Sequence, residues 1–223
     1  MFDNAFSFID EEFYALKVSS RQLDLLLENG WRHFGAHFFR YNLGFYENEI
    51  RLVQPLRVRL SDFTLSKSRR RILKRNQDLQ IIVRPVEITA EKEMLFERHK
   101  RRFKRDAPDS IYDFLVADAA NTPCEALEMC VYDKEKLLAA SFFDVGESAI
   151  SGIYAIFAPE EPARSLGIFT MLLEIDFAVK SGKKFYYSGY AYVGNSFYDY
   201  KKHFAALEKF DWQGNWTNFE EVD

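Results

Sequence analysis

The order of helix and strand patterns after residue 78 constrains the fold more than any other feature of this sequence. Apolar runs rich in β-branched and aromatic residues predict strands at 79–86, 126–132, 137–145, 150–157, 185–187 and 207–210. Helix patterns occur after the capping residue Thr89 to about Lys104 and at 110–119, 168–180 and 196–203. This order predicts an α+β domain over residues 79–223, built on a mixed sheet flanked by helices.

Residues 1–78 are predicted to form a smaller N-terminal α/β module. Its expected elements are a helix at 20–28, a short aromatic strand at 31–41, a strand at 51–60, and a helix over Lys67–Arg75 that Ser66 caps. The basic helix therefore belongs to this module.

Composition is typical of a globular protein in a reducing compartment. Hydrophobic residues make up 48% of the 223 residues and aromatic residues 17%, which is enough for a packed core. The two cysteines, Cys124 and Cys130, are too few for a Cys-rich zinc or iron-sulfur site, so we expect no metal and no cofactor. The acidic N-terminus does not resemble an export signal, and no apolar run is long enough to cross a bilayer. We expect a cytoplasmic protein with no membrane partner.

Positive charge is concentrated in two short segments of a chain whose net charge is −4. Lys67–Arg75 and residues 98–105 each contain six basic residues and no acidic one. This segregation indicates a local site for a polyanion on an otherwise acidic protein. A solvated helix face is the alternative, and it is stronger for 98–105 because Glu91, Glu93 and Glu97 can pair with cations in the same helix.

Residues 163–169, Ala-Arg-Ser-Leu-Gly-Ile-Phe, lie between a predicted strand and a predicted helix. Backbone N–H groups at a helix N-terminus can hold an anion or polarise a carbonyl, although a tight-turn loop is the alternative. The candidates for substrate binding here are Arg164, Ser165, Leu166 and Gly167. The element order resembles the fold of the GCN5-related N-acyltransferases, whose coenzyme A-binding members have glycine or alanine where this chain has Phe169. That bulky side chain argues against acyl-CoA as the donor.

Four stretches carry a more specific resemblance: SRQLDLLLENGWRHFGAHFFRY, QPLRVRLSDFTLSKSRRRILKRNQDL, PARSLGIFTMLLEIDFA and KFYYSGYAYVGNSFYDYKKHF. They resemble, in order, segments of the aminoacyl-tRNA-protein transferases, which are the arginyl-transferases and bacterial leucyl-transferases of the N-degron pathway. The resemblance implies transfer of Arg or Leu from aminoacyl-tRNA to the N-terminal amine of a protein that begins with Asp or Glu. The alternatives are an acyl-CoA-dependent N-acetyltransferase and a non-catalytic tRNA-binding relative.

The chain departs from that family at two places. The family has a cysteine cluster ahead of the Pro-Leu-Arg strand, whereas Ile50 and Val53 stand near two of those positions here, so no metal or iron-sulfur cluster is implied. The family's Asn-Tyr-Lys near the end is Asp199-Tyr200-Lys201 in this chain.

The implied reaction is an attack by an α-amine on an activated ester. An amine with a reference pKa of about 8 has a usable neutral fraction near pH 7, so a weak general base suffices. The candidates for orienting the amine or carrying its proton are Asp144, Tyr200 and Lys201. A turn role is an equal alternative for Asp144, because Gly146 follows it closely.

Binding roles are assigned to two further groups. The aromatic stretch around 185–192 offers Tyr187, Gly189 and Tyr190 for substrate binding, with ordinary core packing as the alternative. The candidates for contacts with tRNA phosphates are Lys67, Arg69, Arg70, Arg71, Lys74 and Arg75. His33 and His37 have no obvious carboxylate or cysteine partner in the sequence, so we expect no metal site there.

Overall fold

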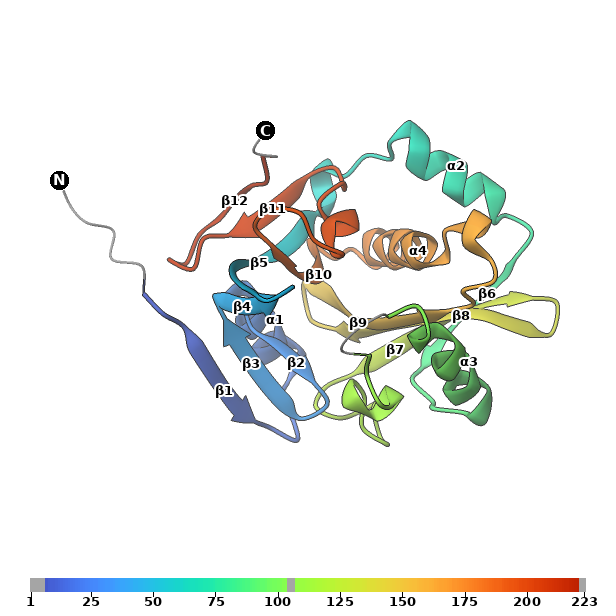
Figure 1. Cartoon of the computed structure of the whole chain (residues 1–223), viewed down its shortest axis with the longest axis horizontal. Helices are drawn as coiled ribbons and strands as arrows, with labels where there is room; N and C mark the ends of the chain where they lie inside the picture. Colours follow the sequence, from blue (N-terminus) through green and yellow to red (C-terminus); the bar gives the residue numbers. More distant parts are fainter. Residues whose placement is uncertain (1–6, 104–106, 221–223) are drawn as a thin grey trace.

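A computed structural model describes residues 7–103 and 107–220 (Figure 1). Its helices are α1 (Ser20–Glu28), α2 (Lys67–Arg75), α3 (Ala90–Lys100) and α4 (Leu166–Lys180). Its strands are β1 (Asp10–Tyr14), β2 (Arg32–Phe34), β3 (His37–Tyr41), β4 (Leu43–Tyr46), β5 (Glu49–Arg59), β6 (Gln80–Pro85), β7 (Ala126–Asp133), β8 (Lys136–Val145), β9 (Ala149–Phe157), β10 (Phe185–Tyr192), β11 (Leu207–Phe210) and β12 (Trp216–Asn218). Short 3-10 helices cover Leu60–Asp62, Ile111–Asp113, Pro162–Arg164 and Asp199–Lys201.

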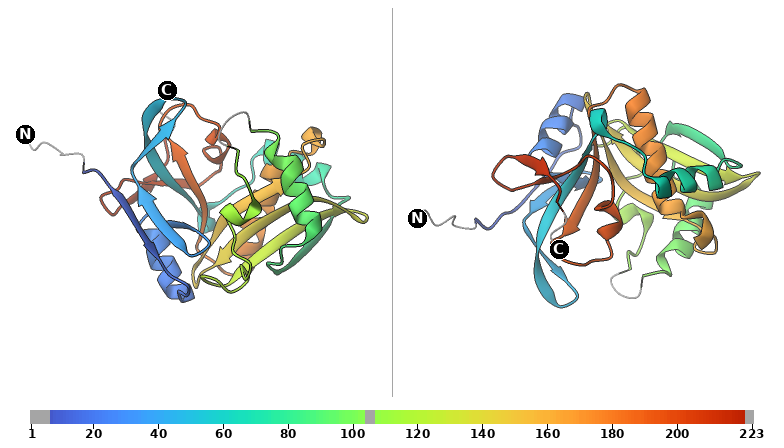
Figure 2. Two further views of the ribbon diagram at one scale, coloured as in Figure 1. Left: turned by 60° about the horizontal axis from the view of Figure 1, so that its bottom comes forward. Right: turned by 90° about the horizontal axis from the view of Figure 1, so that it is seen from above.

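The large sheet is mixed, in the order β12-β11-β5-β10-β9-β8-β7-β6, with β4 paired to β5. β9 and β10 run parallel, whereas the other neighbours in this order are antiparallel. α3 and α4 cover opposite faces (Figures 1 and 2). The adjacent residues Phe142 and Phe143 of β8 accordingly point into two different core clusters. The predicted α+β class, with a mixed sheet flanked by helices, is confirmed.

β5 joins the two ends of the chain in one sheet. It pairs with β10 on one side and with β11 on the other, although both partners lie far downstream in the sequence. The boundary predicted after residue 78 therefore does not coincide with an edge of this sheet.

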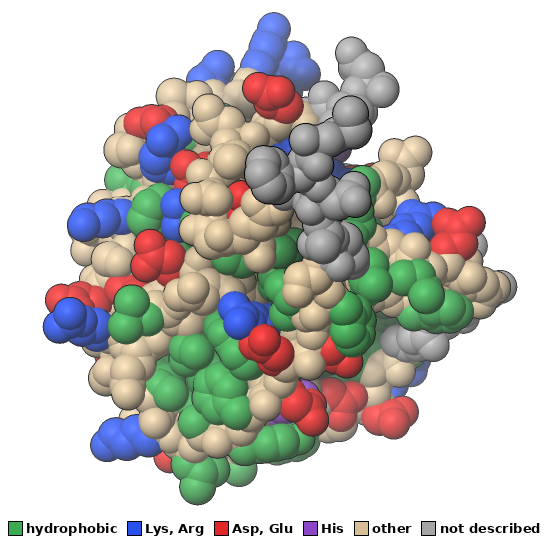
Figure 3. Space-filling model, turned by 90° about the vertical axis from the view of Figure 1, so that its left-hand side faces the viewer, with side chains coloured by type: hydrophobic (Ala, Val, Ile, Leu, Met, Phe, Trp, Pro, Cys, Tyr) green, Lys and Arg blue, Asp and Glu red, His purple; other side chains and the backbone are tan. Residues whose placement is uncertain are grey.

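A separate three-stranded sheet, in the order β1-β3-β2, lies beside β4 and β5 (Figure 1). The sequence predicts one strand over 31–41, whereas the chain turns back at Gly35, whose φ is +52°. Ahead of this hairpin, Ser19 and Gln22 form a capping box at the start of α1. Figure 3 shows the face on the left-hand side of Figure 1, where basic and acidic side chains are interspersed rather than segregated.

The prediction of a helix at 110–119 is wrong. Residues 110–119 contain only the 3-10 helix Ile111–Asp113, because the carbonyl of Phe114 accepts a hydrogen bond from Gly35 N at 3.0 Å instead of continuing a helix. The short helix predicted at 196–203 is likewise reduced to Asp199–Lys201. Among the described residues, none of the helices combines the length and the apolar character needed to cross a bilayer.

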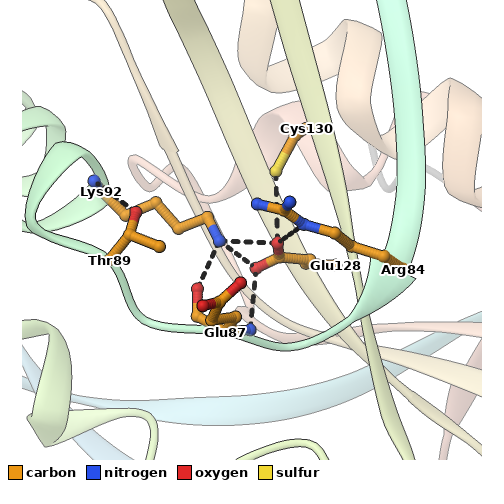
Figure 4. Close-up of polar contacts among 6 residues, drawn as sticks. All are labelled: Arg84, Glu87, Thr89, Lys92, Glu128 and Cys130. Carbon is orange, nitrogen blue, oxygen red and sulfur yellow. Dashed lines mark hydrogen bonds and ion pairs between the residues drawn. The ribbon is translucent and has the colours of Figure 1, made fainter.

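A buried ion cluster joins α3 to the sheet (Figure 4). Lys92 Nζ lies 2.6 Å from both carboxylate oxygens of Glu128 and also donates to the carbonyl of Glu87. Arg84 Nε donates to Glu128 Oε1 at 2.7 Å from the neighbouring strand β6. Both Lys92 and Glu128 are fully buried, so each charge depends on the other for the hydrogen bonds that water would otherwise supply.

Candidate active site

A cavity of about 780 Å³ lies where β9 and β10 diverge. The two strands pair only between residues 149–151 and 185–187, after which β10 continues along β5 and leaves β9. Gly152 of β9 and Ser188, Gly189 and Tyr190 of β10 line the gap. The first turn of α4 and the end of α3 complete its walls.

The N-terminus of α4 forms one wall of the cavity. Ser165, Leu166 and Gly167 line it, and Ser165 has a left-handed backbone with φ +53°. N–H groups in the first turn of a helix have no acceptor within the helix and carry a partial positive charge. This wall can therefore hold an anion or polarise a carbonyl, while the part of these residues in substrate binding stays a prediction.

Glycine at 167 and phenylalanine at 169 have packing reasons. A Cβ at Gly167 would lie 2.9 Å from Cε1 of Phe157, so glycine allows α4 to approach β9 closely. Phe169 is only 3% exposed and packs in the core. Because the Phe169 side chain is buried and does not line the cavity, its bulk gives no argument against a coenzyme A pyrophosphate there.

Lys201 and Tyr200 reach the cavity from the 3-10 helix Asp199–Lys201. Lys201 Nζ donates to the carbonyl of Tyr190 at 3.0 Å. Burial, followed by the positive charge of Arg32, lowers the pKa of Lys201 to about 7. The ammonium and the free amine of Lys201 are therefore both populated near neutral pH, as proton transfer requires.

Glu174 is a cavity residue that the sequence analysis did not identify. It lies on α4, and its Oε2 accepts a hydrogen bond from Tyr186 at 2.7 Å. Burial raises the pKa of Glu174 to about 7. The sequence contains a signal for it, because Glu174 lies on the same face of α4 as the buried apolar residues Met171 and Ile175.

Asp144 is separated from the cavity. It is 1% exposed at the end of β8, where its Oδ2 lies 2.9 Å from His33 Nε2 and its Oδ1 accepts from Cys124 Sγ at 3.4 Å. It is not among the cavity-lining residues, so a direct contact with a substrate in the cavity would require rearrangement.

The expectation that His33 and His37 lack acidic or cysteine partners is wrong. His33, Asp144 and Cys124 place their ligand-type atoms within 4.8 Å of one another, and His37 Nε2 lies 2.8 Å from Glu12. Burial, followed by the negative charge of Asp144, raises the pKa of the Cys124 thiol. Asp144 is hydrogen-bonded to both His33 and Cys124, and the absence of a metal here stays a prediction.

Two other candidates also lie outside the cavity. Tyr187 packs in a core cluster with Leu23 and Leu27, and its hydroxyl accepts from Arg57 at 3.2 Å. Arg164 forms an ion pair with Asp78 at 3.0 Å. Its guanidinium is thereby directed to the surface rather than to a substrate.

The positions where the sequence departs from the resembled family have local explanations. Val53 is 2% exposed in the core, whereas Ile50 is 70% exposed on β5. Asp199 accepts hydrogen bonds from both the backbone and the hydroxyl of Ser196 at 2.9 Å and pairs with Lys202 at 2.6 Å. Aspartate at this position therefore stabilises the turn that carries Tyr200 and Lys201.

The basic helix α2 packs against α4 beside the cavity wall (Figure 1). Arg75 donates to the carbonyl of Ala163, and Asn76 Nδ2 donates to that of Arg164 at 2.9 Å, so the end of α2 is fixed to the loop that enters α4. Arg70 bonds the carbonyl of Leu65, and Arg69 stacks on Phe204. Lys67, Arg71 and Lys74 are exposed, and within the described parts of the chain no carboxylate pairs with them.

The second basic segment, 98–105, is partly neutralised. Arg98 pairs with Glu160 at 2.6 Å and Lys100 with Glu97 at 2.7 Å. Arg102 lines the cavity between the rings of Phe157 and Phe197. Residues 104 and 105 lie outside the described residues.

Comparison with known proteins identifies related sequences. A family model described as "Arginine-tRNA-protein transferase, C terminus" matches residues 91–211. An "Aspartate/glutamate leucyltransferase" of Leptospira interrogans is 26% identical over 197 residues, which are 86% of this chain and 75% of that protein. A protein of the same name from Xanthomonas axonopodis pv. citri is 33% identical over 171 residues, 72% of this chain and 68% of the relative.

Solved structures show more distant similarity. L-PGS from Bacillus licheniformis aligns with 84% of this chain and 55% of its own, at 19% identity and a TM-score of 0.49. A GCN5-related glucosamine N-acetyltransferase region of a fungal GH3 β-N-acetylglucosaminidase aligns with 88% of this chain and 23% of its own, at 14% identity and a TM-score of 0.46.

Proposed function

Since the chain belongs to the arginine-tRNA-protein transferase family, we propose that it transfers leucine from leucyl-tRNA to the N-terminal α-amine of a protein that begins with Asp or Glu. Leucine is favoured over arginine because the similar curated proteins are named leucyltransferases. The proposal extends to a role in the N-degron pathway in the cytoplasm, with aminoacyl-tRNA as co-substrate and without a metal or other cofactor. The free, buried state of Cys124 and Cys130 supports a reducing compartment.

The observation that carries the proposal is the junction between the basic helix and the cavity. α2 is tied at its C-terminus to the loop 162–165, and the same loop opens the helix that lines the cavity. A tRNA acceptor stem on the exposed cations of α2 can therefore direct its 3′ end into the cavity. An acyl-CoA donor has no comparable use for that helix.

The cavity contains the groups that aminoacyl transfer requires. First-turn N–H groups of α4 can stabilise the oxyanion that forms when the amine attacks the ester carbonyl. The amine then loses a proton, and the ribose hydroxyl that leaves takes one up. Lys201 and Glu174 both change protonation near pH 7, so neutral Lys201 can accept the first proton while protonated Glu174 donates the second.

A transfer assay tests the proposed function. The protein is incubated with labelled leucyl-, arginyl- or phenylalanyl-tRNA and with peptides that differ only in a first residue of Asp, Glu, Ala or Lys. We expect leucine on the Asp and Glu peptides and a rate at least about 100-fold lower on the Ala peptide. Arginine transfer would correct the donor, acetylation by acetyl-CoA would favour the alternative enzyme, and tRNA binding without transfer would indicate a non-catalytic relative.

Replacing Lys67, Arg71 and Lys74 together with alanine is expected to weaken tRNA binding and reduce its dependence on salt. These three cations have no carboxylate partner within the described parts of the chain, so their loss removes phosphate contacts without exposing a buried acid. The slope of log K against log salt should fall by about 2 if all three meet phosphates. Fluorescence anisotropy over a salt series measures it.

The control is the triple variant of Lys17, Lys134 and Lys180, which removes the same charge from exposed positions outside α2. An equal effect of both triple variants would mean that net charge, rather than the basic helix, governs tRNA affinity.

A further inference from the structure

Arg32 places a positive charge in the cavity without an ion-paired carboxylate in the described structure, although the buried carboxylate of Asp144 acts on it electrostatically. The residue is 9% exposed, and its two terminal nitrogens donate at 2.6 Å to Ser151 Oγ and to the carbonyl of Gly152, both neutral acceptors. No carboxylate forms an ion pair with it in residues 7–103 and 107–220. Burial correspondingly lowers the pKa of Arg32. A desolvated guanidinium of this kind favours binding of an anion.

The space next to Arg32 is kept open. Gly189 has φ +93°, and a Cβ there would lie 3.5 Å from Cζ of Arg32 and 3.3 Å from Nζ of Lys201. Ser188 is 7% exposed, lines the same cavity, and its Oγ has no hydrogen-bond partner in the described structure. This hydroxyl is therefore available to a polar group that enters the cavity. Arg32 and Lys201 thus both lie close to Gly189, and Ser188 lines the same cavity.

We propose that Arg32, assisted by Ser188, binds the side-chain carboxylate of the acceptor's N-terminal Asp or Glu. The inference rests on the proposed function and assigns its specificity to named residues. A guanidinium matches a carboxylate in planarity and in charge. In the proposed function the phosphates of tRNA bind the exposed helix α2, not Arg32. The cavity wall near Arg32 also includes the apolar side chains Phe34 and Ile153, which can contact the methylene groups of a small acidic side chain.

This placement also orients the reacting amine. In an N-terminal Asp or Glu the α-amine and the side-chain carboxylate are separated by only a few covalent bonds. A carboxylate held by Arg32 therefore brings the amine beside Lys201. The carboxylate is thereby a positioning contact, and its loss lowers the rate as well as the affinity.

The test compares peptides that begin with Asp, Glu, Asn or Gln in the wild type, Arg32→Gln and Arg32→Lys. We expect Arg32→Gln to lower kcat/KM for the Asp peptide about 100-fold while changing that for the Asn peptide by less than about threefold. Arg32→Lys should retain part of the preference. An Asp-to-Asn ratio that stays at the wild-type value in Arg32→Gln would overturn the proposal, and so would equal loss for all peptides with a raised KM for tRNA, which would indicate a phosphate contact.

Two further variants separate specificity from folding. Ser188→Ala removes one oxygen and is expected to raise KM for the Asp peptide by about three- to tenfold, with the Asn peptide unaffected. Arg57→Gln is the matched control, because Arg57 is an equally buried arginine that pairs with Glu208 away from the cavity. It should leave the Asp-to-Asn ratio unchanged, and a change as large as that in Arg32→Gln would contradict the assignment.

Calorimetry of Asp and Asn peptides distinguishes failure of this inference from failure of the proposed function. Selective, Arg32-dependent binding of the Asp peptide by a protein that transfers no amino acid would leave the carboxylate site standing and remove the function. Transfer of the amino acid with no Arg32-dependent selectivity would leave the proposed function standing and remove the carboxylate site.

Discussion

A Lys92→Met variant is expected to lose about 3 to 5 kcal/mol of its free energy of unfolding. Lys92 is fully buried, and its ammonium supplies hydrogen bonds of 2.6 Å to both oxygens of Glu128. Methionine fills a similar volume but leaves the Glu128 carboxylate in the core with Arg84 as its one charged partner among the described residues. Urea titration followed by circular dichroism measures the loss.

Two further variants test whether the unpaired Glu128 carboxylate causes that loss of stability. Adding Glu128→Gln to Lys92→Met removes the uncompensated charge and should restore at least about half of the lost stability. Lys180→Met breaks the exposed ion pair with Asp176 on α4 and should cost less than about 0.5 kcal/mol. If Lys92→Met cost no more than Lys180→Met, the buried cluster would not be a major support of the fold.

A Lys201→Met variant is expected to lower kcat for transfer by about 100- to 1000-fold, with KM for tRNA little changed. The wild-type rate should rise with pH up to about 7, because the free amine is the form that accepts a proton. This limb of the pH profile should be absent in the variant. Single-turnover rates between pH 5.5 and 9 measure both effects, and a variant that kept the limb would transfer the role to Glu174.

The free energy of unfolding of Lys201→Met shows whether Lys201 acts in catalysis or in maintaining the structure. The pKa of Lys201 is lowered in the folded protein, so the unfolded chain binds the proton more tightly. This difference destabilises the folded protein. The destabilisation is fully present below about pH 7 and disappears as the pH rises toward 10.5, the ordinary pKa of lysine. Because the side chain retains partial solvent access, we expect Lys201→Met to be about 1 to 3 kcal/mol more stable than the wild type at pH 6, and less so at pH 9. A loss of stability at pH 6 would indicate a structural role.

Elements with strong local signals could be predicted from the sequence. Ser66 caps α2 and Asn76 ends it, and the apolar spacing along α4 gives that helix nearly to the residue. β1 was not predicted, because its Asp-Glu-Glu run is exposed and becomes a strand only by pairing with β3. Tertiary hydrogen bonding decides such elements, and it is not encoded in a local window.

The residues of the candidate site also fall into those that local patterns predict and those that only the fold brings together. Ser165, Leu166 and Gly167 lie at the helix N-terminus that local patterns predict, and this N-terminus forms part of the cavity wall; their role in substrate binding stays a prediction. Arg32 and Glu174 come from β2 and α4, and only the assembled fold brings them to one cavity. Asp144 was a reasonable candidate by type, but its partner His33 lies more than a hundred positions earlier and could not be found from spacing.

Synthesis of the chain produces β5, already paired at its start with β4, long before its partners β10 and β11 exist. Its buried residues Val53, Leu56 and Val58 leave the ribosome early, whereas the strands on either side begin at Phe185 and Leu207. The central part of the sheet therefore closes only when translation is nearly complete, and contacts of such sequence separation form slowly. Until then residues 53–59 of β5 lack the neighbours β10 and β11, and an apolar strand segment with unpaired edges is the kind that chaperones protect from aggregation.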